Sequence, residues 1–188
     1  MHTNSTISTK RLVFAALMAA LVTVGSALRI TLPMDIGGNT SFHLGNIFCA
    51  LSGVLLGPWL GGLAAGLGSA IYDMTNPIFI SECWLTFLMK GAYGLSAGLI
   101  IRIGRKEFGY TKATLATSAG ALTYAALYLV KSYFKPIIVQ GVTHQAAWLT
   151  LIGKLPATVF NVAVAIIFAP ILALTIEKAL ARNHLTLE

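Results

Sequence analysis

The chain has 188 residues, of which 56% are hydrophobic and only 10% are charged. Soluble domains carry about 25% charged residues, so this composition predicts an integral membrane protein and excludes a soluble enzyme. The formal net charge of +7 is then read as a topology signal rather than as a nucleic-acid-binding surface. Two cysteines, Cys49 and Cys83, are too few for a disulfide scaffold. They could meet near the outer surface, but each is expected as a free thiol.

The hydropathy pattern predicts an all-α protein, a bundle of six transmembrane helices in one domain over residues 1–188. The predicted helices span residues 11–32, 44–56, 59–74, 84–103, 111–134 and 146–181. A helix that crosses a bilayer needs about 20 residues, so the second and third are short. Because Gly57-Pro58 between them is a turn signal, they could be two short helices, a re-entrant hairpin or one kinked span.

The positions of Lys and Arg help to choose between these counts, because basic residues concentrate at cytoplasmic helix ends. With six spans and a cytoplasmic N-terminus, the outside ends carry Arg29, Lys131 and Lys135. The inside ends carry the larger group, Lys10, Arg11, Arg102, Arg105, Lys106, Lys112, Lys178 and Arg182. One kinked span over 44–74 would place the cluster at 102–112 on the wrong side. Both termini are therefore expected in the cytoplasm, and a re-entrant hairpin would keep the same parity.

The first predicted helix carries alanines four residues apart, Ala15 with Ala19 and Ala16 with Ala20. Small residues at this spacing share a helix face and let another backbone approach closely. The third helix repeats the spacing with glycines. The pattern fits packing inside the bundle, and it also fits a face that binds a partner protein.

Motifs for catalysis, nucleotide binding and metal binding are missing from the sequence. There is no Walker A motif and no His-Glu-x-x-His, and the four histidines have no metal-ligand spacing. No nucleophile elbow surrounds a serine. The sequence therefore predicts neither an enzyme nor a protein that holds a metal or cofactor.

Polar and aromatic residues gather toward the outer helix ends, which predicts a wet pocket for a small, planar, hydrogen-bonding solute. Lys90 and Lys154 lie inside predicted helices, and Asn161 follows Lys154 by seven residues on the same face. A charge at membrane depth is costly unless it is paired or hydrated, and it indicates a functional site. The other possibility for Lys90 is a structural ion pair with Glu82 or Asp73.

Several other residues near this pocket have a structural interpretation beside the functional one. Trp84 and Trp148, at helix starts, could be interfacial belt residues. His43 could be an ordinary loop histidine. Lys131 and Lys135 are expected to snorkel to the outer surface.

Residues 12–21 resemble the Ala-x-x-x-Ala helix of the S components of energy-coupling factor (ECF) transporters, the substrate-binding subunits of vitamin importers. Residues 43–46, 55–58, 61–68 and 72–73 are similar to the second and third helices of vitamin S components. Residues 86–87 and 90–91 fit the same group. The resemblance covers nearly the whole chain.

This resemblance implies a multi-pass, bacterial-type plasma-membrane protein that lies in lipid and binds a vitamin from outside. It also implies a transmembrane coupling protein and two cytoplasmic ATPases as partners, against which the subunit topples so that its site faces inward. The implied partner contact is Ala15, Ala16, Ala19 and Ala20. The implied substrate contacts are His43, Asn46, Trp84, Lys90, Tyr93, Tyr128, Lys154 and Asn161.

The identity of the vitamin stays open at this point. The short chain and modest loops favour pyridoxine or hydroxymethylpyrimidine, and the lysines would equally suit the carboxylate of pantothenate or folate. Riboflavin and cobalamin are further members of the group. The alternative function is an autonomous ion-coupled transporter in which Asp73, Glu82 or Lys90 couples the ion, and an intramembrane enzyme or assembly factor ranks third.

Overall fold

The computed structural model describes residues 8–32, 39–103 and 108–183. The predicted all-α bundle is confirmed: these residues form six helices with one short hairpin, and four of the helices are long and apolar enough to cross a membrane. In chain order the elements are α1 (Thr9–Ala27), β1 (Arg29–Leu32), β2 (Thr40–His43), α2 (Gly45–Leu56), α3 (Pro58–Thr75), the short 3-10 turn η1 (Ile80–Glu82), α4 (Cys83–Arg102), α5 (Tyr110–Gln140) and α6 (His144–Arg182).

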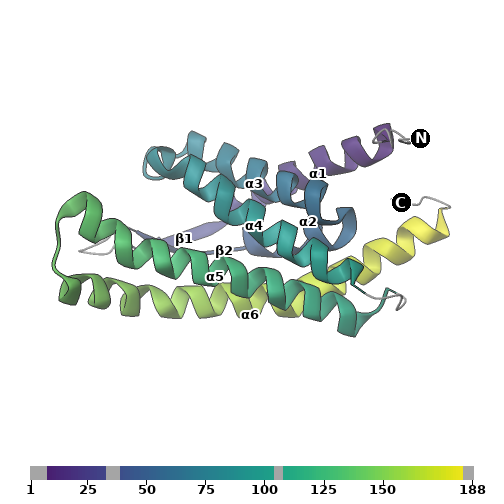
Figure 1. Ribbon diagram of the computed structural model, residues 1–188. Coiled ribbons are helices and arrows are strands. Elements are labelled where there is room, and N and C mark those ends of the chain that lie inside the picture. The colour runs from purple at the N-terminus through teal and green to yellow at the C-terminus, as the bar shows by residue number, and fades with distance from the viewer. Residues whose placement is uncertain (1–7, 33–38, 104–107, 184–188) are drawn as a thin grey trace, which may run out of the picture.

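The helices run side by side along one axis, and α5 and α6 form the longest antiparallel pair (Figure 1). The start of α1 and the end of α6 lie at the same end of the bundle (Figure 1), which we call the terminal end. The opposite end, which we call the cavity end, holds η1 and the turn between α5 and α6 (Figure 1). Because the start of α1 and the end of α6 lie at the same end, the chain crosses the bundle an even number of times.

The prediction that the first helix continues to Leu32 was wrong. The helix ends at Ala27, and Arg29–Leu32 pairs antiparallel with Thr40–His43 in the register Arg29↔His43 and Leu32↔Thr40. Ile30 and Thr31 are β-branched, which favours extended backbone. The apolar side chains of Ile30 and Leu32 had extended the predicted helix, whereas the strand depends on its pairing with Thr40–His43, which lies outside that stretch of sequence.

Helix α2 lies inside the bundle, and ten of its twelve residues are buried. Twelve helical residues run only about 18 Å, less than the roughly 30 Å of a bilayer core, and β2 leads into α2 through Leu44. Close packing surrounds α2: a Cβ added at Gly53 would overlap the Gly94 carbonyl oxygen of α4. The glycine pattern of this region therefore serves packing within the bundle.

The two alanine pairs of α1 lie in different surroundings. Ala15 and Ala19 pack against the core, and a Cβ added at Gly68 of α3 would overlap the Ala19 carbonyl oxygen. Ala16 and Ala20 are exposed on the outer side of the helix. Internal packing thus explains one pair, and the other is available to lipid or a partner.

Helix α5 continues beyond its predicted end at residue 134. Pro136 lies within the helix, which runs to Gln140 and ends at Gly141 in the left-handed conformation (φ 65°). Proline inside a helix removes one backbone hydrogen bond, and membrane helices tolerate this where neighbouring groups satisfy the backbone. At 31 and 39 residues, α5 and α6 are each longer than a bilayer core requires.

Candidate functional site

A cavity of about 250 Å³ opens at the cavity end of the bundle, between the hairpin and the adjoining parts of the helices. Six of the eight predicted substrate contacts line it, namely His43, Asn46, Lys90, Tyr128, Lys154 and Asn161. Trp84 lies outside the cavity and is 60% exposed on the outer surface of the bundle. Tyr93 is fully buried and stacks on a cavity-lining ring rather than lining the cavity itself.

Lys90 forms part of the buried wall of this cavity. The residue is 3% exposed, and its ammonium donates a hydrogen bond to Asn46 Oδ1 on α2. Its Nζ also lies 3.9 Å from the centroid of the Tyr124 ring, a cation–π contact. Within the described chain, neither Glu82 nor Asp73 forms the ion pair with Lys90 that was considered from the sequence. The ammonium is held instead by a neutral amide and an aromatic face.

Three tyrosines form a stack, which we call the tyrosine ladder, and two of them, Tyr124 and Tyr128, line one wall of the cavity. Tyr93 of α4 stacks on Tyr124 of α5 at 5.9 Å, and Tyr124 stacks on Tyr128 at 5.9 Å, with interplanar angles of 22° and 26°. Tyr124 and Tyr128 share a face because they lie one helical turn apart. Lys131 and Lys154 approach the Tyr128 ring at 5.7 and 5.8 Å from its centroid. The wall is therefore flat, aromatic and flanked by positive charge.

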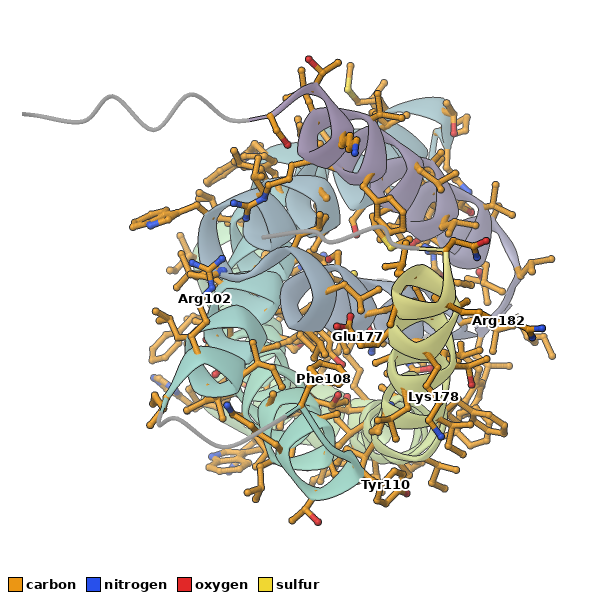
Figure 2. The ribbon with its side chains drawn as sticks, turned by 90° about the vertical axis from the view of Figure 1, so that its right-hand side faces the viewer. Arg102, Phe108, Tyr110, Glu177, Lys178 and Arg182 are labelled. Carbon is orange, nitrogen blue, oxygen red and sulfur yellow. The ribbon has the colours of Figure 1, made fainter. Side chains whose placement is uncertain are left out.

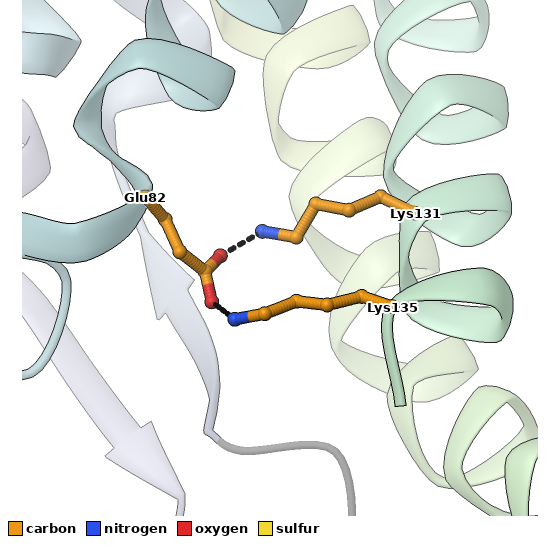
Figure 3. Close-up of polar contacts among 3 residues, drawn as sticks. All are labelled: Glu82, Lys131 and Lys135. Atoms are coloured by element: carbon orange, nitrogen blue, oxygen red, sulfur yellow. Dashed lines mark hydrogen bonds and ion pairs between the residues drawn. The ribbon is translucent and has the colours of Figure 1, made fainter. Parts of the chain in front are cut away.

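Glu82 of η1 accepts hydrogen bonds from Lys131 and Lys135, which lie one turn apart on α5 (Figure 3). The prediction that these two lysines snorkel to the outer surface was wrong, because both turn toward this carboxylate. One carboxylate between two ammonium groups ties η1 to α5 across the cavity wall. We call this group the ion triad.

Asn161 uses both ends of its amide on the backbone of β2. Its Nδ2 donates to the Ser41 carbonyl at 2.7 Å, and its Oδ1 accepts from the His43 N–H at 3.0 Å. The contact joins α6 to the hairpin over more than a hundred residues of sequence. Asn161 is thus a positioning residue for the hairpin as well as a lining residue of the cavity. Lys154, on the same helix face, lines the same cavity.

The hairpin contributes two further groups. The Arg29 guanidinium lies over the rings of Tyr72 and Phe79, at 4.1 and 4.7 Å from their centroids. The second is His43, whose imidazole lines the cavity. Its Nδ1 is buried without a hydrogen-bond partner in the described part of the protein.

Sequence reasoning did not select Tyr124 or Arg29 as parts of a site, and it did not predict that Glu82 pairs with Lys131 and Lys135. The i, i+4 spacing of Tyr124 and Tyr128 was available in the sequence, but an aromatic pair in an apolar helix usually indicates core packing. The remaining groups depend on the hairpin and on η1, whose positions follow only from long-range contacts. Cys49 and Cys83 are both free, as expected.

Comparisons with known proteins agree with this architecture. Residues 6–178 match the family described as "ECF-type riboflavin transporter, S component". A protein of Pyrococcus woesei named "Uncharacterized protein in gap 3'region" is 32% identical over 113 residues, which cover 60% of this chain and 71% of that protein. Among solved structures, the S component for biotin from an ECF-type ABC transporter superposes with a TM-score of 0.61 at 13% identity, over 92% of this chain and 94% of the other.

Proposed function

Because the chain belongs to the family of S components of ECF-type riboflavin transporters, we propose that the cavity binds one vitamin or vitamin precursor with high affinity for import. The observation that carries the proposal is the wall of aromatic and cationic side chains along the 250 Å³ cavity. A pocket of this kind, mostly preformed with a few convergent polar groups, suits a small molecule. The family is one of transport subunits rather than of enzymes.

The size of the cavity favours a small vitamin. Pockets for drug-sized ligands usually measure about 300–1,000 Å³, and this one lies below that range. A single aromatic ring of the pyridoxine or hydroxymethylpyrimidine type would fit along the tyrosine ladder, and pantothenate has a similar bulk. Riboflavin is the next candidate, whereas folate and cobalamin are larger.

We propose that the protein lies in a bacterial-type plasma membrane with its terminal end on the cytoplasmic side. Arg102, Lys178 and Arg182 gather at this end (Figure 2), and Arg11, at the start of α1, donates to the Leu56 carbonyl at 3.0 Å. Basic residues at one end are the usual mark of the cytoplasmic side. Arg105 and Lys106, which entered the same argument from the sequence, lie outside the described residues.

The proposed partners are a transmembrane coupling protein and two cytoplasmic ATPases. The outer face of α1, with Ala16 and Ala20, would receive the coupling protein, because small exposed residues allow close approach of another helix. Toppling of the bundle against that protein would turn the cavity inward. Ala15 and Ala19 would contribute only through the packing of α1 on the bundle.

Binding by the purified protein tests the proposal. Trp59, Trp84 and Trp148 are 54–73% exposed on the outer surface, so calorimetry and ligand-induced thermal stabilisation are better readouts than intrinsic fluorescence. Saturable binding of one vitamin at nanomolar concentration, without ATP or partners, is expected to raise the melting temperature. No binding across a panel of B vitamins and precursors would contradict the proposal. Uptake by the isolated protein in liposomes under an ion gradient would favour the autonomous transporter.

A further inference from the structure

The cavity carries an excess of positive charge among its described lining residues. Five cationic side chains and two carboxylates line it. The cations are Arg29, Lys90, Lys131, Lys135 and Lys154, and the carboxylates are Asp73 and Glu82. An uncharged vitamin would leave this imbalance in place, whereas an anion would reduce it.

Both carboxylates already interact with other cavity residues. The two oxygens of Glu82 each accept a hydrogen bond within the ion triad, from Lys131 and from Lys135 (Figure 3). Asp73 lines the cavity together with Thr86 and interacts electrostatically with Arg29. Asp73 also interacts electrostatically with Lys90, but within the described chain neither carboxylate forms an ion pair with this ammonium.

Among the five cations, the buried Lys90 ammonium is the one that an anionic ligand would stabilise most. It is nine-tenths buried or more, and in the described chain its hydrogen-bond and ring contacts are the Asn46 amide oxygen and the rings of Tyr124 and Tyr93. Neutral acceptors and ring faces offset only part of the cost of burying an ammonium, and a charged acceptor makes the stronger hydrogen bond. Asn46 is itself 2% exposed and lines the same cavity.

From these contacts we propose that the imported molecule carries a fixed negative charge, a carboxylate or a phosphate, that binds the Lys90 ammonium beside Asn46. The inference rests on the proposed function and adds the chemical class of its substrate. The ring of the molecule would lie along Tyr124 and Tyr128, and Lys154 would add to the positive potential. The site thus selects an aromatic or compact organic anion over its neutral analogue.

Matched pairs of compounds that differ in charge and little else test this inference on the unmodified protein. Suitable carboxylate pairs are nicotinate with nicotinamide, 4-pyridoxate with pyridoxine, and pantothenate with pantothenol. Pyridoxine 5′-phosphate with pyridoxine, and riboflavin 5′-phosphate with riboflavin, are the phosphate pairs. The anionic member of the pair that binds is expected to bind at least ten-fold more tightly by calorimetry, and the type of pair distinguishes a carboxylate from a phosphate.

Substitution of Lys90 then locates the anion. Lys90→Met is expected to weaken binding of the anion by roughly 10- to 150-fold, the scale of a hydrogen bond to a charged group. The same change should bring the two members of the pair to within a few-fold of each other, and Lys90→Arg should retain part of the preference. Lys178→Met, which removes an exposed lysine of the terminal end, is the matched control and should leave both affinities unchanged.

The outcomes separate the inference from the function on which it rests. Equal or tighter binding of the neutral member by the unmodified protein would overturn the anionic substrate and leave the vitamin-binding function intact. A retained anion preference in folded Lys90→Met would also overturn the assignment to Lys90. If no member of any pair binds, the proposed function fails and the inference fails with it. If Lys90→Met does not fold, the paired titrations of the unmodified protein still decide the charge preference.

Discussion

Helices α1 and α5 both repeat a residue type every four positions, but the two repeats lie in opposite surroundings. On α1, Ala16 and Ala20 face outward and leave a shallow apolar surface. On α5, Lys131 and Lys135 turn inward and bind one carboxylate across the cavity wall. The spacing defines a common helix face in each case. Which way that face points is set by packing with the neighbouring helices, so the functions of the two faces differ.

The largest expected effect is a loss of folding stability when the packing of α3 against the inner face of α1 is disrupted. In Gly68→Leu the added side chain meets the Ala19 backbone, and overpacking of this kind costs about 1–3 kcal/mol or more. Little folded protein should be recovered from detergent extracts, as judged by size-exclusion chromatography and melting temperature. Ala20→Leu on the outer face is the control and should behave like the unmodified protein. Comparable losses of folded protein in both variants would mean that the two faces of α1 do not differ in packing.

The outer face of α1 should affect import without affecting binding. Ala16→Trp or Ala20→Trp places a bulky ring where close helix approach is proposed. Vitamin uptake by cells that also contain the coupling protein and both ATPases should be lost, whereas the affinity of the purified variant should stay within about two-fold. Trp in place of the exposed Leu122 on α5 serves as the control substitution. Normal uptake by both alanine variants would exclude this face as the coupling contact.

The inner face of α6 should affect binding. Lys154→Ala removes a buried ammonium that lines the cavity near Tyr128, and binding is expected to weaken by roughly 1–3 kcal/mol, the scale of a lost buried polar partner. Calorimetric titration of the vitamin measures this change. Lys178→Ala, further along the same helix and exposed, provides the matched control. An unchanged affinity in Lys154→Ala would remove this lysine from the site.

Much of the bundle and part of the site could be predicted from local sequence. Lys90 and Lys154 were recognisable as site candidates because a charged side chain inside an apolar helix is costly to bury unless it is paired or hydrated. The hairpin was not predictable, because Arg29–Leu32 reads as the end of an apolar helix until its pairing with Thr40–His43 is known. Trp84 was named as a substrate contact because the resemblance implied it, yet the helix turns it outward. Local patterns thus identified membrane depth and helix faces, whereas the direction of each face required long-range contacts.

The smallest expected effect tests the ion triad, and it has two parts of opposite sign. Glu82→Gln leaves Lys131 and Lys135 without their shared carboxylate, although all three side chains are 15–31% exposed and water compensates in part. A loss of about 1 kcal/mol is expected, which corresponds to a fall in Tm of about 2–4 °C for a chain of this size.

The same substitution should tighten binding of an anionic ligand, because it makes the cavity more positive. Glu177→Gln, an exposed carboxylate at the terminal end (Figure 2), controls for the general effect of removing a negative charge. It should change neither Tm nor affinity. Thermal scans and calorimetric titrations of the two variants, run in parallel, measure both quantities. A fall in Tm together with weaker anion binding would show that the ion triad shapes the cavity rather than setting its charge, and the contrast between α1 and α5 would then rest on packing alone.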